Sequence, residues 1–176
     1  MKEVKNMKGC EHCGILFEDF EPLGFYANIE ESEVKAKLGK DNGIYLIEVK
    51  ELGRLIVENK TFIQSVLSDK VPAWIIKRIV ERDVNPLIKY STISGCKIIY
   101  IGKAESDAKT LYKRFMDLLT GAHTNRNSLW TMLEHGWKWE FWYKKNENGQ
   151  NLTAIEKNLR IDYERSHKRK PNLNRV

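Results

Sequence analysis

The sequence predicts an α+β fold, built from three short strands and several helices. Two runs rich in β-branched and aromatic residues, 42–49 and 96–102, have the composition of buried strands. A third segment, 137–143, alternates aromatic and polar side chains with the period of two that is typical of a half-buried strand. Other stretches repeat apolar residues at helical spacing, which indicates amphipathic helices beside the sheet.

Each of the first two predicted strands carries a tyrosine close to a glycine. A Gly-Ile-Tyr triplet ends at Tyr45, and a Tyr-Ile-Gly triplet begins at Tyr100. Neighbouring strands would bring the two phenols onto one face, and glycine lets a backbone or a ligand approach closely. The two tyrosines are therefore the first candidates for a functional site.

Length and composition favour a folded domain with a core of its own. The chain has 176 residues, of which 41% are hydrophobic. No apolar run approaches the ~18 residues of a membrane span, and the first residues lack the apolar core of a signal peptide. We therefore expect a cytoplasmic protein without a membrane partner, with 1–40 as an N-terminal extension packed on the body and 41–176 as the main domain.

The positive charge is concentrated after residue 40. Residues 1–40 hold 6 basic and 8 acidic side chains, a net of −2, which leaves 24 against 16, or +8, for 41–176. A basic domain suits a polyanionic partner. Nucleic acid is favoured over a membrane surface because the sequence has no basic helix with a large apolar face.

Three cysteines exclude a fully paired disulfide framework. Cys10 and Cys13 form a Cys-x-x-Cys pair with His12 between them, and Cys96 follows much later. A structural zinc site normally has four ligands, and the sequence offers no second pair at matching spacing. Reduced thiols are therefore the expected state, and zinc at Cys10 and Cys13 is not expected.

A helical hairpin is predicted between the first two strands, at about 58–90. Its outer side is basic, and the hairpin could either cover one face of the sheet or contact nucleic acid. A second basic run ends the last helix. The candidate contacts for nucleic acid are Lys77, Arg78, Arg82 and Lys89 in the hairpin and Lys168, Arg169 and Lys170 near the end.

The helix predicted at 108–119 begins near Ser106 or Asp107, either of which could cap it. Arg114 lies roughly 60° around this helix from Leu111 of the apolar stripe. The guanidinium could therefore reach into a cleft, or it could be a solvated surface group beside Lys113.

The last helix is predicted at 152–167, and Glu156 lies beside its apolar stripe. Glu156 also has a structural alternative, because Thr153 and Glu156 have the spacing of a capping box. In the preceding strand, the tryptophans are expected in the core or covering the sheet, although Trp142 could stack on a base if it faces outward.

These elements, taken in order, resemble the GIY-YIG nuclease family over residues 42–174. The triplets at Tyr45 and Tyr100 match the two naming motifs letter for letter. The helix arginine of the family corresponds to Arg114 and its metal-binding glutamate to Glu156. Its closing asparagine corresponds to Asn174, and the lysine of repair-type members corresponds to Lys103.

The chain departs from the family pattern in three places. Tyr45 and Tyr100 are separated by 54 residues, as in insertion-bearing members of the restriction-enzyme branch. Leu118 stands where many members have histidine or tyrosine, with His123 as a possible substitute. Asn172 competes with Asn174 for the position of the closing asparagine.

The resemblance implies a small, mainly antiparallel three-stranded sheet flanked by helices, with the helical hairpin as an insertion. It implies hydrolysis of DNA phosphodiesters by water, with one Mg²⁺ or Mn²⁺ held by Glu156 and phosphate charge neutralised by Arg114. Tyr45 or Tyr100 would accept or relay a proton, and Lys103 and the cation could lower the pKa of that tyrosine by favouring the phenolate.

The expected function is therefore that of a DNA endonuclease of the restriction or mobile-element type. A binding module that keeps the fold without catalysis and a DNA repair nuclease are the alternatives. A homodimer would suit a palindrome cutter, but no interface is readable from the sequence.

Overall fold

The computed structural model describes residues 9–10, 13–16, 19–25, 29–53, 96–120, 129, 132–133 and 136–174. The predicted hairpin at 58–90, with Lys77, Arg78, Arg82 and Lys89, lies outside these residues, as does His123. Within the described part of the chain, no helix is long and apolar enough to cross a membrane.

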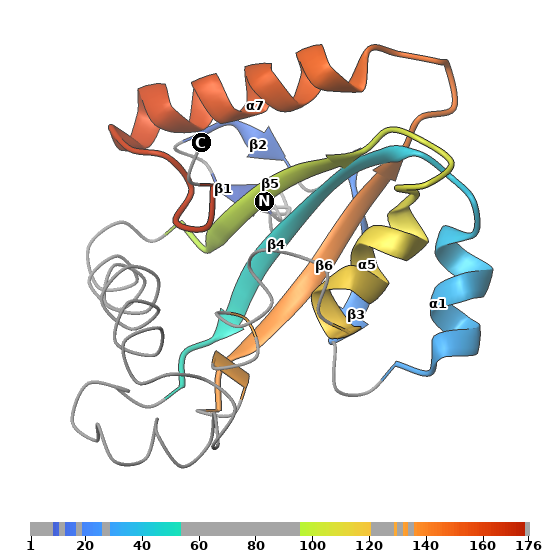
Figure 1. The fold of residues 1–176 in the computed structure, drawn as a ribbon. Coiled ribbons are helices and arrows are strands. Elements are labelled where there is room, and N and C mark those ends of the chain that lie inside the picture. Colours follow the sequence, from blue (N-terminus) through green and yellow to red (C-terminus); the bar gives the residue numbers. More distant parts are fainter. Residues whose placement is uncertain are drawn as a thin grey trace, which may run out of the picture.

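The fold is α+β, with a four-stranded antiparallel sheet and three helices in the described residues (Figure 1). The strand order is β3-β6-β4-β5. The bounds are Glu21–Phe25 for β3, Gly43–Glu51 for β4, Ile98–Ala104 for β5 and Lys138–Lys145 for β6. The predicted three-stranded sheet is thus one strand short, because β3 was missed.

The central strand β4 is buried on both faces of the sheet. Its residues 43–49 are all buried, which explains why this segment reads as a continuous apolar run rather than an alternating one. The neighbouring β6 places Phe141 and Trp142 on opposite faces, in two separate core clusters. Trp142 is buried and donates its ring N–H to Glu48 at 2.9 Å, which confirms the expected core position and excludes the alternative that it faces outward toward a base.

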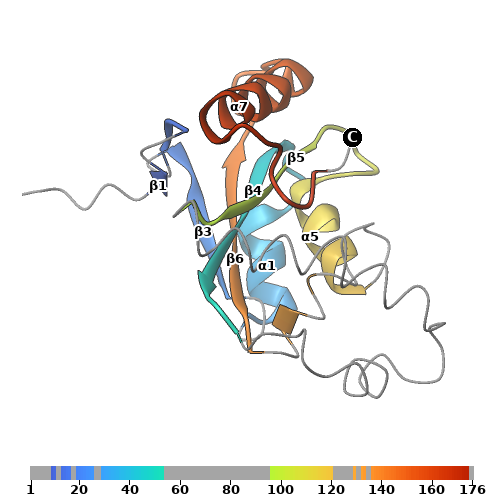
Figure 2. The same ribbon diagram turned by 90° about the vertical axis from the view of Figure 1, so that its left-hand side faces the viewer.

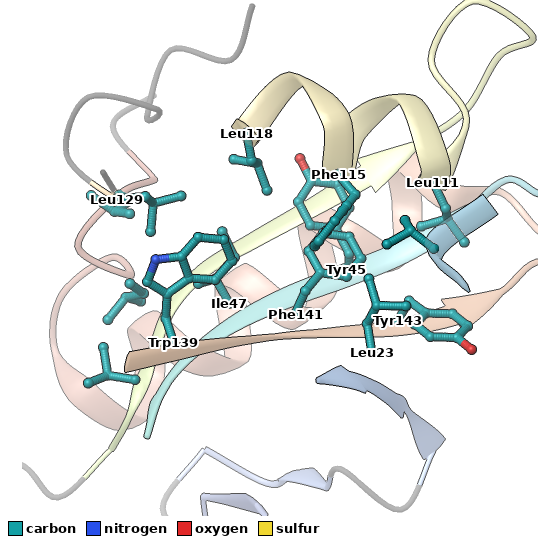
Figure 3. Close-up of a cluster of buried hydrophobic side chains, with 14 of the residues drawn as sticks. Leu23, Tyr45, Ile47, Leu111, Phe115, Leu118, Leu129, Trp139, Phe141 and Tyr143 are labelled. Atoms are coloured by element: carbon teal, nitrogen blue, oxygen red, sulfur yellow. The ribbon is translucent and has the colours of Figure 1, made fainter. Parts of the chain in front are cut away.

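The helices lie on both faces of the sheet (Figures 1 and 2). Helices α1 (Glu31–Leu38) and α5 (Leu111–Thr120) pack on the face that carries Tyr45 and Phe141. Helix α7 (Leu152–His167) packs on the opposite face, mainly against β5. Figure 3 shows Tyr45 beneath α5, inside the cluster of buried side chains on the first face.

The described parts of the N-terminal segment pack on the rest of the fold. A hairpin of β1 (Gly9–Cys10) and β2 (Ile15–Leu16) comes first. Strand β3 then pairs with β6 at the sheet edge, and Leu23 and Leu38 are buried in the main core. Strand β3 of this segment therefore belongs to the same sheet as the two strands that carry the tyrosines.

Helices α5 and α7 each begin directly after a residue whose side chain caps the helix. Helix α5 begins at Leu111, where the Thr110 hydroxyl accepts a hydrogen bond from the Lys113 backbone N–H at 3.3 Å. The predicted start near Ser106 or Asp107 is therefore about three residues too early. The predicted bounds of α7 are confirmed, with Asn151 as its capping residue.

Candidate active site

The two tyrosines meet on one face of the sheet. In the β4–β5 ladder, Tyr45 pairs with Gly102, and Tyr100 lies diagonally beside it on the same face. The ring centroids of Tyr45 and Tyr100 are 5.7 Å apart with an interplanar angle of 32°. Tyr45 also stacks on Phe141 at 5.0 Å, so its ring is held on both sides (Figure 3).

The glycine of each triplet is required by close packing. A Cβ atom on Gly102 would lie 2.6 Å from Cζ of Tyr45 and 2.6 Å from Cε1 of Tyr100. A Cβ atom on Gly43 would lie 2.1 Å from the carbonyl oxygen of Lys144 in β6. The absence of a side chain at Gly102 therefore makes the space in which the two phenols approach each other.

Burial holds both phenols in the neutral form. Burial raises the pKa of Tyr45 well above its usual value, and the neighbouring Tyr100 raises it further. Burial also raises the pKa of Tyr100, but a hydrogen bond from Tyr45 lowers it, as a hydrogen bond to the charged oxygen should. Tyr100 is only partly buried, whereas Tyr45 is 1% exposed. Tyr100 is therefore the better candidate for the group that meets a substrate.

Arg114 supplies the positive charge of the site. It lies on α5, on the same face of the sheet as the tyrosines, and its charge favours the phenolate forms of Tyr45 and Tyr100. Its Nε atom is buried without a hydrogen-bond partner among the described residues. A buried guanidinium N–H normally has an acceptor, so this donor is suited to an anionic ligand.

Glu156 reaches the same region from α7. Asn151 caps α7 by accepting a hydrogen bond from the Ala154 N–H at 3.0 Å, so the alternative of a Thr153–Glu156 capping box is wrong. Burial raises the pKa of Glu156, while Arg160, Lys103 and Arg114 oppose the rise. The negative charge of Glu156 in turn raises the pKa of both tyrosines. The carboxylate thus acts on the phenols although it comes from the other face of the sheet.

A surface hollow of about 320 Å³ opens beside Glu156 on α7. Its lining combines opposite charges, because Arg160 lies 3.7 Å from Glu156 and Lys170 lies at the rim. Thr153 and Glu164 of the same helix complete the polar lining. The hollow therefore gives solvent and ions access to the carboxylate of Glu156.

Glu156 fits the requirement of a single divalent cation. It is half-buried, and desolvation already disfavours its charge, so a bound cation would relieve that cost. Mg²⁺ is commonly held by one or two carboxylates and keeps several waters. Among the predicted site residues, Glu156 is the carboxylate that can serve as this ligand.

Lys103 contacts groups on the α7 side of β5. Its ammonium group contacts the Glu105 carboxylate and the Thr153 hydroxyl, and Thr153 also donates to Glu105 at 2.9 Å. Burial raises both tyrosine pKa values, and a lowering by Lys103 together with the cation stays a prediction. Lys103 lowers the pKa of Glu105 and opposes the rise at Glu156.

Asn174 binds the backbone between the tyrosine and the glycine of β5. Its Oδ1 accepts from the Ile101 N–H at 2.8 Å, and its Nδ2 donates to the Ile101 carbonyl at 2.6 Å. Asn174 therefore positions β5 on its open edge. Asn172, the competing residue, accepts a hydrogen bond from Arg169 and makes no such clamp.

The structure also places Leu118 of α5 and the three basic residues that lie near the end of the chain. Leu118 is 2% exposed in the core, so this position of α5 offers no polar group. Arg169 donates to Asn172 and to Tyr163, which makes it a structural residue of the chain end. Lys168 and Lys170 are exposed and stay available to a polyanion.

Sequence reasoning missed two charged groups beside Glu156. Arg160 follows Glu156 by four residues, a spacing that predicts an ion pair on a helix. Glu105 raises the pKa of Glu156 from the loop after β5, and no sequence signal places it there. Comparison with protein-family models, with curated proteins and with solved structures gave no match to this chain.

Proposed function

We propose that this protein is a metal-dependent DNA endonuclease of the GIY-YIG type that hydrolyses phosphodiester bonds. One observation supports this above all others. Tyr45 and Tyr100 form a hydrogen-bonded pair over Gly102, and the charges of Arg114 and Glu156 shift the pKa of both phenols. Four groups from β4, β5, α5 and α7 thus act on a common region, as a site for a phosphate and a cation requires.

Arg114 is the residue proposed to bind the phosphate. Its charge and its unpaired buried Nε–H are matched to a phosphate oxygen, and negative charge grows on that oxygen as water attacks. Removing such a donor typically costs about 10²- to 10³-fold in rate.

Tyr100 is the residue proposed to receive the proton of the attacking water. It is more accessible than Tyr45, and the hydrogen bond from Tyr45 favours the Tyr100 phenolate. Tyr45 is then the neutral donor that orients and stabilises Tyr100. Because the pKa of Tyr100 is raised, only a small fraction is ionised at neutral pH, so cleavage should accelerate as the pH rises.

Glu156 is proposed to hold the divalent cation, Mg²⁺ or Mn²⁺, from the side of α7. When bound, such a cation supplies Lewis-acid stabilisation of phosphate charge. Lys103 and Glu105 adjust the charge next to this carboxylate, and Asn174 keeps β5 in place.

The DNA partner is supported by the net charge of +6, by the exposed Lys168 and by Lys170, which lines the hollow beside Glu156. The long segment between Tyr45 and Tyr100 favours a restriction or mobile-element enzyme over a repair nuclease. Cytoplasmic location and a possible homodimer belong to the same proposal.

A second function has one observation in its favour. Leu118 is buried in the core at the position where many members of the family have a polar side chain. A protein with the fold but without effective catalysis would bind DNA and leave it intact.

Incubation of the full chain with supercoiled plasmid and Mg²⁺ or Mn²⁺ tests the two functions. We expect nicked or linear DNA with the native chain and at least ~100-fold slower cutting with Glu156→Gln. Glu164→Gln is the matched control, because Glu164 lies two turns further along α7 and lines the same hollow. Binding without cutting, under either cation, would support the binding module instead.

A further inference from the structure

A second cluster of side chains with metal-binding chemistry lies away from the tyrosines. The Sγ atoms of Cys13 and Cys96 and a ring nitrogen of His167 all lie within 4.8 Å of one another. Cys13 and Cys96 are 5% and 3% exposed, and His167 is half-buried. These residues are 83 and 71 positions apart in the sequence, so the fold brings them together.

We propose that Cys13, Cys96 and His167, together with Cys10, bind a structural zinc ion. Zinc favours four thiolate and imidazole ligands in a tetrahedron, with Zn–S near 2.3 Å and Zn–N near 2.0 Å. Ligand atoms in such a site are about 3.5–3.8 Å apart. The observed cluster needs only a small contraction to reach that geometry.

Cys10 is assigned as the fourth ligand from its spacing to Cys13 in the sequence. The backbone of Cys10 lies in β1, where it pairs with Ile15 of β2 across the hairpin. Cys13 lies two residues before Ile15, and Gly14 between them is in the left-handed region at a φ of 63°. The Cys-x-x-Cys spacing is the half-site of many structural zinc proteins. Cys96 and His167 supply the other half, which sequence spacing alone did not reveal.

The surroundings favour a closed structural site over a catalytic one. Buried Ile15, Ile98 and Tyr163 belong to the same core cluster as the two cysteines. The Tyr163 ring packs on the His167 ring with centroids 4.5 Å apart, and its hydroxyl donates to the Ile98 carbonyl at 3.2 Å. The imidazole is thus held in place, and four protein ligands leave no open position for a substrate.

The zinc ion would join three remote parts of the chain. Strands β1 and β2 have only two residues each, too few for an independently stable hairpin. Cys96 lies two residues before β5, and His167 is the last residue of α7. The ion would therefore fix the hairpin to the strand that carries Tyr100 and to the helix that carries Glu156. This proposal does not depend on the proposed nuclease activity.

Elemental analysis of the full chain, purified without a polyhistidine tag, tests the zinc site. We expect about one zinc per chain, and at least tenfold less zinc in Cys96→Ser and in His167→Ala. Ser166→Ala is the matched control at the exposed end of α7 and should keep its zinc. Iron in place of zinc, or a native chain with no bound metal, would overturn the proposal.

Two measurements on the native chain avoid the risk that a variant fails to fold. Cobalt(II) in place of zinc should give the strong absorption of tetrahedral thiolate coordination. A chelator should lower the Tm and make the cysteines reactive to a thiol reagent, and Zn²⁺ but not Mg²⁺ should reverse both effects. Thiols equally reactive before and after chelation, or a cobalt spectrum typical of oxygen ligands, would contradict the site.

Discussion

Tyr45 lies directly opposite Gly102 in the β4–β5 ladder, and its ring fills the space that a side chain at position 102 would need. The same space receives the edge of Tyr100. The Tyr-Ile-Gly triplet is thus a packing unit, in which the glycine determines how closely the two phenols approach. This relationship makes the separation of the phenols sensitive to one methyl group.

Gly102→Ala should separate the two tyrosines and stop cleavage. The added Cβ would overlap both rings, and overpacking of a core typically costs about 1–3 kcal/mol. Chemical denaturation would measure the loss of stability, and the plasmid assay the loss of cutting. Gly149→Ala is the control, because its Cβ meets nothing within 4 Å but its φ of 60° is unfavourable for alanine. If both variants keep full activity, Gly102 has no role in spacing the phenols.

The sequence predicted the elements of the site better than their contacts. The triplets lie on paired strands, and α7 has the predicted bounds, because strong apolar patterns and a capping asparagine define these segments. Strand β3 was missed because Pro22 and Gly24 interrupt it, and both residues are unfavourable inside a strand. The structure accommodates them at a register shift on the sheet edge.

Long-range contacts were the part that the sequence could not supply. The position of Glu156 allowed either a site residue or a capping-box residue, and the capping role is excluded because Asn151 caps α7 in the structure. Lys103 was expected near a phenol because it follows Gly102. However, alternation along β5 turns it to the other face, toward Thr153 of α7. The meeting of Cys96 with His167 follows no spacing rule at all.

The cleavage rate should rise with pH, and Tyr100 should be responsible. Burial raises the pKa of Tyr100, so the fraction of phenolate increases about tenfold for each pH unit below that pKa. We expect the log of the single-turnover rate to increase with pH between 6 and 9 in the native chain. Tyr100→Phe should cut at least ~100-fold more slowly and lose the pH dependence. An unchanged slope in Tyr100→Phe would assign the proton transfer to another group.

Stability should fall in alkaline solution because the phenols are buried. The pKa of Tyr45 is raised in the folded state. Its contribution to the free energy of unfolding is therefore fully present below about pH 10, the pKa of a tyrosine in the unfolded chain. It is lost as the pH rises toward the folded-state pKa, at about 1.4 kcal/mol per pH unit. In urea unfolding above pH 10, the free energy of unfolding should therefore decrease less steeply with pH in Tyr45→Phe than in the native chain.

Tyr143→Phe provides the control for this measurement. Burial and the Glu21 carboxylate, which accepts from the Tyr143 hydroxyl at 2.6 Å, also raise the pKa of Tyr143. Like Tyr45→Phe, this variant should lose less unfolding free energy above pH 10 than the native chain, but its DNA cleavage should be unchanged. A native-like alkaline fall in Tyr45→Phe would show that Tyr45 ionises freely in the folded chain.

Asn174→Ala should weaken both stability and cleavage, because Asn174 satisfies both backbone groups of Ile101. Asn174 is 7% exposed, and leaving a buried backbone group unpaired costs about 1–3 kcal/mol. Since Ile101 lies between Tyr100 and Gly102, a loosened β5 should misplace the phenol of Tyr100.

The cleavage rate of Asn174→Ala, measured at a temperature where the variant remains folded, should then decrease by more than its unfolded fraction explains. Asn172→Ala, which removes only a contact with Arg169, should cut at the native rate at that temperature. Equal losses in the two variants would mean that the whole chain end, rather than the clamp on Ile101, supports the strand.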